Sequence, residues 1–204
     1  MPADRFCRDF VATPRQSRPH PELDGTTDDR HPLLLGLCGS VSPSLPLGTA
    51  IAYHSIRHPT HSEDCYRLNP PDRLLQLAAI QTTPVDALNV EQAVCSVADK
   101  QAIARAFGVT AIDMESLALV RQFPQAAIIR VVSDDLGGDI PDLSQAFDEQ
   151  GNLQPLALAL AFVRQPIAAV RLIHGSLRAL ECLTAVTRAI VTAGYQKNEI
   201  PKKW

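Results

Sequence analysis

Residues 126–135 read Ala-Ala-Ile-Ile-Arg-Val-Val-Ser-Asp-Asp, so a buried-strand pattern ends there in the carboxylates of Asp134 and Asp135. The run Ala-Ile-Asp-Met-Glu-Ser at 111–116 repeats this arrangement and carries Glu115, nineteen residues before Asp134. In an open α/β sheet, ligands bind outside the carboxyl ends of the strands. The two runs therefore predict an α/β fold in which adjacent strands bring Glu115 and Asp134 to one site.

Length and composition indicate a globular protein with one sizeable core. The chain has 204 residues, of which 46% are hydrophobic and 20% are charged. Its net charge is −3 and it has no basic motif, so nothing indicates a nucleic-acid partner. Five scattered cysteines without a C-x-x-C pair favour reduced thiols in the cytoplasm. No signal peptide or membrane span is predicted, because the apolar region 156–173 is interrupted by Arg164, Pro166 and Arg171.

Alternating strand and helix patterns follow an irregular start. Residues 1–31 lack periodicity and are expected to form a tail, followed by one α/β domain over 32–204 whose last third is helical. The predicted strands are 33–37, 47–53, 93–97, 109–112 and 126–132, with a turn at 38–40 after the first. The predicted helices are 72–80 with Asp72 as N-cap, 99–107 ended by Gly108, about 114–122, 155–163, and one from Pro166 ended by Gly194. Inward-facing helical positions are expected at Leu74, Leu75, Ala78, Leu117, Ala118, Val120, Leu180, Leu183, Val186 and Ile190.

Asp134 is the candidate catalytic residue. At the end of a buried strand, partial burial would let its carboxyl group hold a proton and deliver it to a leaving group as a general acid. Ser133 lies directly before it and is a candidate substrate contact. The alternative interpretation is structural, because serine and aspartate are common helix caps and turn residues.

Glu115 is the candidate ligand-hydroxyl acceptor. An ionised carboxylate accepts two hydroxyl hydrogen bonds at once, which is what the 2′,3′-diol of a ribose offers. Met114 would supply a soft apolar floor for the sugar. The alternative is that Glu115 only places a favourable charge in the first turn of a helix.

Two further patterns are less specific. The run Gly-Leu-Cys-Gly-Ser at 36–40 is either a tight turn or a set of backbone N–H groups that faces an anion or a nucleophilic water. It lacks the full G-x-G-x-x-G pattern, so a dinucleotide-dependent oxidoreductase is disfavoured. His54, His58 and His61 are interpreted as exposed loop histidines because Pro59 prevents a shared helical face, and no metal site is predicted.

Taken together, these motifs resemble the phosphorylase superfamily of purine nucleoside phosphorylases and methylthioadenosine nucleosidases. The matching segments are 35–40, 47–53, 94–100, 113–116 and 132–134, in the family's order, and the likeness covers about 32–160. It implies a three-layer sheet flanked by helices, a small-molecule purine nucleoside as substrate and a homo-oligomer. It also implies no cofactor, although phosphate can act as a co-substrate.

The resemblance implies a role for each candidate residue. Asp134 would be the acid at purine N7, Glu115 would accept the ribose diol and Met114 would pack on the sugar. Cys38 and Gly39 would lie near the attacking water or phosphate, and the choice between these two nucleophiles stays open. The transition state in this family resembles an oxocarbenium ion. Glu115 would help to form it by orienting the sugar, and Asp134 by making the purine a better leaving group.

The tract 139–143, followed by 148–153 and an apolar helix, looks most like the bacterial hopanoid-associated phosphorylases. Members of that group are thought to remove adenine from adenosylhopane, a lipid nucleoside. The resemblance therefore implies an adenine-type substrate that is lipid-linked and membrane-associated. The apolar helices of 156–173 fit either a lipid-linked substrate, a subunit contact or an ordinary core.

One departure from the family concerns the start of the chain. The family opens with a βα unit that contributes the first strand and part of the anion site, and 1–31 shows no such pattern. We therefore expect an incomplete sheet edge near 33–37, weak or absent catalysis by the chain as written and a tendency to oligomerise. The alternative function is that of an inactive remnant of this fold that acts as a binding protein.

Overall fold

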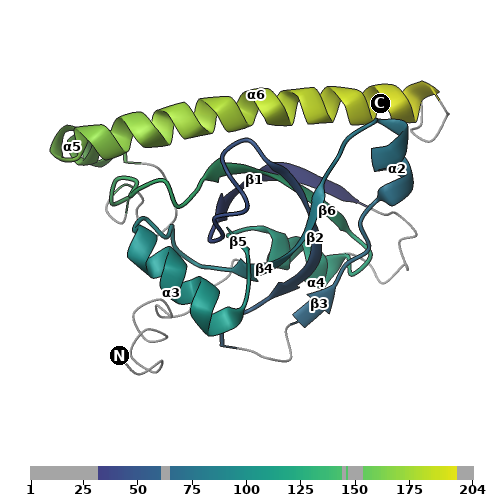
Figure 1. Ribbon diagram of the computed structural model, residues 1–204, viewed down its shortest axis with the longest axis horizontal. Helices are drawn as coiled ribbons and strands as arrows, with labels where there is room; N and C mark the ends of the chain where they lie inside the picture. Colours follow the sequence, from purple (N-terminus) through teal and green to yellow (C-terminus); the bar gives the residue numbers. More distant parts are fainter. Residues whose placement is uncertain (1–31, 61–64, 144–145, 147–153, 197–204) are drawn as a thin grey trace.

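One mixed sheet of six strands organises the computed structural model, which describes residues 32–60, 65–143, 146 and 154–196. The strands are β1 (Leu33–Ser40), β2 (Ala50–Arg57), β3 (Cys65–Arg67), β4 (Thr83–Asn89), β5 (Ala111–Asp113) and β6 (Ala127–Asp134). Their order is β3-β2-β4-β5-β1-β6, and β6 also pairs with β2. The pairing of β6 with β2 closes β2, β4, β5, β1 and β6 into a ring, to which β3 is added at the edge of β2. Figure 1 shows this ring of strands end-on.

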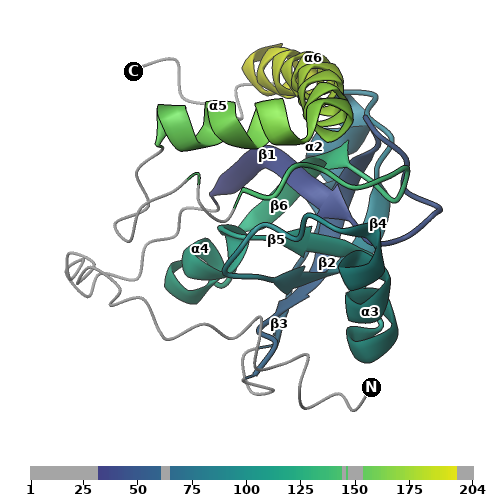
Figure 2. The same ribbon diagram turned by 90° about the vertical axis from the view of Figure 1, so that its left-hand side faces the viewer.

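Strand directions explain how the ring closes. The β1–β6, β2–β4 and β4–β5 pairs are parallel, whereas β1–β5 and β2–β6 are antiparallel. Helices lie outside the sheet, which confirms the predicted α/β class with a sheet flanked by helices. They are α2 (Asp72–Leu77), α3 (Val97–Phe107), α4 (Ser116–Gln122), α5 (Pro155–Arg164) and α6 (Pro166–Gln196). Figures 1 and 2 show α6 crossing one side of the ring while α3 and α4 cover other parts of it.

Three apolar clusters attach the helices to the sheet. One joins the sheet to α4 through Leu117 and Val120, and a second joins α3 to β4 and β5 through Ile103. The third packs α2 and α6 on β6 and includes Ile129 and Ile190. Each fully buried valine, leucine or isoleucine contributes about 1.5–3 kcal/mol, so these clusters fix the helices against the strand ends.

The predicted strand at 126–132 is confirmed as β6, which continues for two more residues through Ser133 and Asp134. The predicted strand at 33–37 is confirmed as β1, but the expected turn at 38–40 is wrong. The strand continues there because Gly39 and Ser40 pair with Ile112 and Ala111 of β5. The strand expected at 47–53 starts later, at Ala50, and runs to Arg57.

The strand predicted at 93–97 is wrong. Residues 93–96 form no regular structure. Helix α3 begins at Val97, two residues before the predicted start. It begins there because the Ser96 side chain caps the helix by accepting a hydrogen bond from Asp99 N at 3.1 Å. The strand in this part of the chain is β4, whose apolar pattern is interrupted by Pro84 and Asp86. The short β3 was also missed, since three residues carry too little periodicity.

The helix predictions are confirmed except at several ends and faces. Gly108, with a φ of 64°, ends α3 as predicted, and Pro166 opens α6. The N-cap of α2 is Pro71 rather than Asp72, and Ala118 of α4 is exposed. The sheet-facing side of α6 includes Ala179, Val186, Ile190 and Ala193, so Leu180 points outward, and the helix continues past Gly194.

The first strand has one open edge. β6 pairs with β1 from Leu33 to Gly39, whereas β5 reaches only Gly39 and Ser40 on the other side. In the described part of the chain, the edge of residues 33–37 that faces away from β6 therefore has no strand partner, as expected. The predicted tail of 1–31 lies outside the described residues, as does the tract 148–153.

No single helix in the described ranges is long and apolar enough to cross a membrane. The helices α5 and α6 reach that length and composition only as a pair, with a bend of 117° between them.

Candidate active site

A cavity of about 210 Å³ opens where β1, β5 and β6 end. The structure brings all six predicted site residues to its wall: Cys38, Gly39, Met114, Glu115, Ser133 and Asp134. Further lining comes from strand residues and from apolar side chains after β4 and β6: Leu37, Ile112, Asp113, Arg130, Val90, Ala93, Val94 and Ile140. A pocket with apolar walls and a few convergent polar groups is the usual form of a small-molecule site.

The strands that carry the two acids are not neighbours, contrary to the prediction. β1 lies between β5, which precedes Glu115, and β6, which ends in Asp134. The intervening strand contributes Cys38 and Gly39 to the floor of the cavity between the two acids. Three strand ends therefore build the site.

A β-bulge aims Ser133 and Asp134 at the cavity. Cys38 pairs with Val132 and Gly39 pairs with Asp134, so Ser133 is one extra residue on β6. The Ser133 hydroxyl group donates to the backbone oxygen of Cys38 at 3.2 Å. Bulges re-aim side chains and are frequent beside active sites, and here two consecutive residues line one cavity.

Gly39 gives the Asp134 carboxylate the space it occupies. A Cβ atom at position 39 would lie 3.1 Å from Asp134 Oδ2 and 2.9 Å from Ile112 Cγ1. Any larger residue would therefore push against the carboxylate and against the side chain beside it. The glycine in the predicted turn is needed for this close approach rather than for turning the chain.

Lys100 is the ion-pair partner of Asp134. It is fully buried, and its Nζ donates to Asp134 Oδ2 and, at 3.1 Å, to the backbone oxygen of Asp135. The Asp134 side chain keeps 17% of its surface exposed, on the cavity side. The sequence analysis considered only partial burial around Asp134, whereas the structure also places a cation against this carboxyl group.

Asp113 organises the backbone around Glu115. Its Oδ1 accepts hydrogen bonds from the N–H groups of Glu115 and Ser116, each at 2.7 Å, and its Oδ2 accepts from the Ser116 hydroxyl at 2.7 Å. Glu115 is the N-cap residue of α4 but makes no capping bond with its side chain. Asp113 thus supplies the hydrogen bonds at the start of α4, and the Glu115 carboxylate is not used as a hydrogen-bonding cap.

Arg130 connects this network to Glu115. Its side chain is only 2% exposed and forms an ion pair with Asp113, in which Arg130 Nε lies 2.7 Å from Asp113 Oδ2. The Nε–H group does not point along this contact and makes no hydrogen bond within the described part of the chain. Its Nη2 donates to Ser116 Oγ at 2.8 Å and to Glu115 Oε2 at 3.5 Å. The guanidinium group passes directly over Gly36, where a Cβ atom would lie 1.9 Å from Nη1. Arg130 thus steadies a Glu115 side chain that is 75% exposed.

The Cys38 thiol behaves as part of the wall. Burial raises its pKa far above the ordinary range, and the nearby carboxylates Asp113 and Asp134 act in the same direction. Burial also raises the pKa of Tyr53, whose hydroxyl donates to Asp113 Oδ2 at 3.1 Å. Because the thiolate is the reactive form of cysteine, Cys38 is unsuited to nucleophilic chemistry here.

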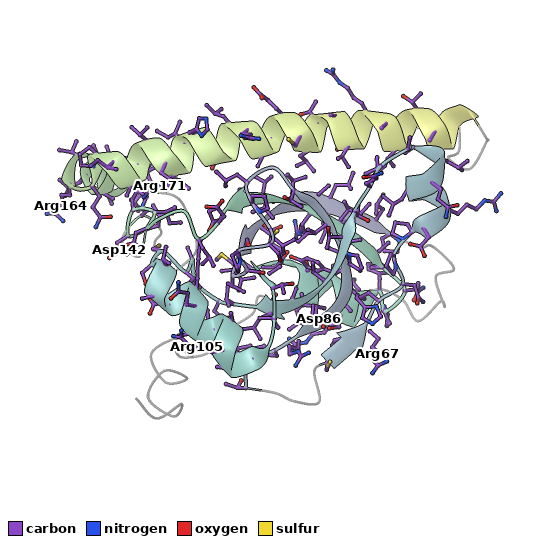
Figure 3. All side chains as sticks on the ribbon, viewed as in Figure 1. Arg67, Asp86, Arg105, Asp142, Arg164 and Arg171 are labelled. Carbon is purple, nitrogen blue, oxygen red and sulfur yellow. The ribbon has the colours of Figure 1, made fainter. Side chains whose placement is uncertain are left out.

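The loop after β6 borders a second cavity, of about 490 Å³, beside the start of α6. Ile140 separates the two cavities, since it lines both. Arg171 of α6 donates to the Asp139 backbone oxygen at 2.9 Å, and Asp142 N donates to the Gln165 side chain at 3.0 Å. Figure 3 shows Asp142 and Arg171 at this junction.

Sequence reasoning missed Lys100 and did not assign Arg130. Both carried a signal: Lys100 shares a helical face with Ile103 and Phe107, and Arg130 is the only charged residue among 126–132. Buried charges need partners, so each pointed to a carboxylate. Of the three histidines considered, His54 lies in β2 and is exposed, His58 follows that strand, and His61 is outside the described residues.

Comparisons with known proteins found similar structures only. No protein-family model and no curated protein matches the chain. A 5′-methylthioadenosine/S-adenosylhomocysteine nucleosidase (MTAN) from Chlamydia trachomatis is 14% identical, with a TM-score of 0.47 over 79% of this chain and 63% of its own. Futalosine hydrolase from Helicobacter pylori is 15% identical, with a TM-score of 0.45 over 76% and 66%. The 5′-methylthioadenosine nucleosidase of Arabidopsis thaliana is 14% identical, with a TM-score of 0.44 over 78% and 61%.

The chain thus spans less than two thirds of the Chlamydia and Arabidopsis proteins and about two thirds of the futalosine hydrolase. At these identities and TM-scores the likeness concerns the course of the backbone alone. We therefore base the function on the side chains of the site.

Proposed function

We propose that this protein cleaves the N-glycosidic bond of an adenine-type purine nucleoside. The observation that carries the proposal is the placement of Asp134, paired with Lys100, and Glu115, held by Arg130, on the wall of one cavity. A carboxyl group that delivers a proton suits a leaving base, and a second, ionised carboxylate suits a ribose diol. Met114 borders the same cavity and offers the apolar surface on which the sugar packs.

The proposed reaction needs only one proton transfer to the base. As the bond between C1′ and N9 breaks, its electron pair stays on the purine, and the proton of the Asp134 carboxyl group passes to N7. Glu115 accepts the 2′- and 3′-hydroxyl hydrogens and holds the sugar while positive charge develops on it. A water molecule then adds to C1′ and loses a proton, which restores Asp134; phosphate is the alternative nucleophile.

The reaction test is the release of free adenine by wild-type protein and by Asp134→Asn. We expect the substitution to lower kcat by about 10²- to 10⁴-fold with little change in nucleoside binding, as for the loss of a general acid. The test compares the rate of adenine release by the variant with that of wild-type protein, so the absolute wild-type rate need not be high. Near-wild-type adenine release by Asp134→Asn would remove this residue from the mechanism.

A second candidate is a nucleoside-binding protein without turnover. One observation favours it: in the described part of the chain, the edge of β1 at residues 33–37 that faces away from β6 has no strand partner. Nucleoside binding by wild-type protein with no adenine release, and the same affinity in Asp134→Asn, would establish this alternative.

The finer substrate class is also a proposal. The exposed side chains of Leu156, Val163 and Ile167 on α5 and α6 support a lipid-linked nucleoside, and equally support a homo-oligomer. We expect a nucleoside with a long apolar 5′ group to show a higher kcat/KM than adenosine. Equal kcat/KM values for the two substrates would remove the support for a lipid-linked substrate.

A further inference from the structure

The Lys100 ammonium is a buried charged group directly beside the cavity. Its side chain is only 1% exposed, and it does not belong to the cavity lining. Two of its three hydrogens have acceptors, in the carboxylate of Asp134 and the backbone oxygen of Asp135. Burying an ammonium group is costly unless it is paired, so Lys100 depends on these two acceptors. The pair therefore places a cation behind Asp134, on the side away from a ligand.

Helix α3 fixes where this ammonium lies. The Ser96 hydroxyl caps the helix, and the backbone N–H of Val97 donates to Asp139 Oδ1 at 2.7 Å. The Ile140 N–H donates to the Cys95 oxygen at 3.0 Å, so the loop after β6 is tied to the start of α3 at two points. Because Ile103 is buried on the same face, α3 cannot rotate without exposing apolar surface. Lys100 and Asp134 are thus held on elements that are fastened to each other.

We propose that Lys100 is a positioning residue that orients Asp134 and stabilises its charge as the proton moves to the leaving purine. This inference rests on the proposed function. When the proton passes from Asp134 to N7, the carboxylate that remains gains the full negative charge, which the adjacent ammonium stabilises. The proton lost by the water that adds to C1′ then returns to Asp134. Lys100 acts through Asp134 and touches neither the base nor the sugar.

A purely structural salt bridge makes a different prediction. If the salt bridge is only structural, replacing Lys100 lowers the stability of the fold. It then lowers the rates of all reactions at the site by the same factor. A positioning role affects only a reaction in which the leaving group needs a proton. Two substrates that differ in this requirement therefore separate the two roles: adenosine, which leaves as a protonated purine, and 4-nitrophenyl β-D-riboside, whose phenolate leaves without protonation.

The test compares Lys100→Met with wild-type protein on both substrates. We expect kcat for adenosine to fall by about 10- to 100-fold, with KM changed by less than about threefold, a smaller loss than that of the general acid itself. On 4-nitrophenyl β-D-riboside the variant is expected to keep its activity within about threefold of wild type. Asp134→Asn should show the same selectivity with a larger loss on adenosine. Arg105→Met is the matched control, since Arg105 is exposed on the same helix and points away from the sheet (Figure 3).

Each outcome decides between the proposals. If Lys100→Met lowers kcat by the same factor on both substrates, or leaves adenosine turnover unchanged, the role of Lys100 is overturned. The proposed function stays intact in either case, provided that wild-type protein releases adenine. A wild-type protein that cleaves neither substrate would overturn both. If Lys100→Met does not fold, as judged by its thermal transition, Lys100→Arg replaces it. The guanidinium group of arginine is larger than the lysine ammonium and should displace the Asp134 carboxyl group. The ratio of adenosine kcat to 4-nitrophenyl riboside kcat should then fall by at least about tenfold. An unchanged ratio would contradict the proposal.

Discussion

At the scale of single residues, Asp113 explains why Glu115 is available for a ligand. Both Asp113 oxygens are engaged, one by the backbone N–H groups that open α4 and the other by Ser116 and Tyr53. A buried carboxylate with this many donors is a rigid support. Glu115, two residues later, projects from that support with most of its side chain exposed.

The contribution of Glu115 can be measured with a substrate that lacks one hydroxyl group. We expect Glu115→Gln to lower kcat/KM for adenosine by about 10- to 150-fold. This factor corresponds to about 1.5–3 kcal/mol of transition-state binding, the value of a hydrogen bond to a charged group. The loss for 2′-deoxyadenosine should be much smaller, because that substrate already lacks the 2′-hydroxyl group. An equal loss for the two nucleosides would show that Glu115 only supports the structure.

Alkaline pH should destabilise the protein through Cys38 and Tyr53. Burial raises both pKa values, so the folded protein retains protons that the unfolded chain releases above about pH 8.5 for the thiol and about pH 10 for the phenol. The folded state then binds more protons than the unfolded state, and the free energy of unfolding falls by about 1.4 kcal/mol per pH unit for each group.

Urea unfolding at pH 7, 9 and 10 measures this slope. Cys38→Ala should be less stable at every pH but should lose less stability between pH 7 and 9, whereas the exposed Cys65→Ser should keep the wild-type slope. A free energy of unfolding that stays constant up to pH 10 would contradict the burial of both protonated groups.

At the scale of elements, the contact between α6 and the end of β6 is unusually close. A Cβ atom at Gly175 would lie 2.4 Å from the backbone oxygen of Ser133. The helix therefore rests directly on the bulge that aims Ser133 and Asp134 at the cavity. The position of α6 and the geometry of the site are linked through this one glycine.

Gly175→Ala tests this contact by the sign of its effect. In an unconstrained helix, alanine is more stable than glycine by about 0.5–1 kcal/mol. Here we expect the substitution to lower the free energy of unfolding by about 1–3 kcal/mol, as in an overpacked core, and to reduce adenine release. Thr184→Ala, an exposed position on the same helix, is the control in the same urea titration. A stabilised Gly175→Ala variant would show that α6 does not press on β6.

The sequence predicts an element well when the pattern that marks it lies within the element itself. β6 and the end of α3 at Gly108 are predicted well because an apolar run and a glycine helix end are local signals. The start of α3 is predicted two residues too late, because the Ser96 cap was assigned to a strand. β4 escapes prediction because its central place in the sheet depends on β2 and β5, which are distant in sequence. The six candidate residues were proposed from strand-end motifs, and the structure places them on the wall of one cavity. The pairing of Lys100 with Asp134 was missed because these residues are 34 positions apart and meet only when α3 packs on β4 and β5, which no local pattern encodes.

At the scale of the whole molecule, the outer side of α6 is the least ordinary surface. Ile167, Val170 and Leu177 are 77%, 68% and 58% exposed and recur at spacings of three and seven residues. A helix with one apolar side on the sheet and another facing water is unusual for a monomer. Figure 1 shows that this helix extends along one whole side of the ring.

We expect the protein to self-associate through this side of α6. Val170→Glu and Leu177→Glu together should shift the sedimentation coefficient toward that of a monomer without lowering the thermal transition, because both side chains are exposed. Arg188→Glu, an exposed change on the same helix, is the control for added negative charge. A wild-type monomer that instead co-sediments with anionic lipid vesicles would replace self-association with a membrane contact.

Whether Asp134 acts as the general acid of a nucleoside-cleaving site is tested most directly by adenine release from adenosine. Purified wild-type protein and Asp134→Asn are compared with and without phosphate. We expect adenine with ribose when water is the nucleophile, or with ribose 1-phosphate when phosphate is. In either case the variant should lose about 10²- to 10⁴-fold in the rate of adenine release. Bound adenosine with no adenine released under either condition, or equal release by Asp134→Asn, would contradict this role of Asp134.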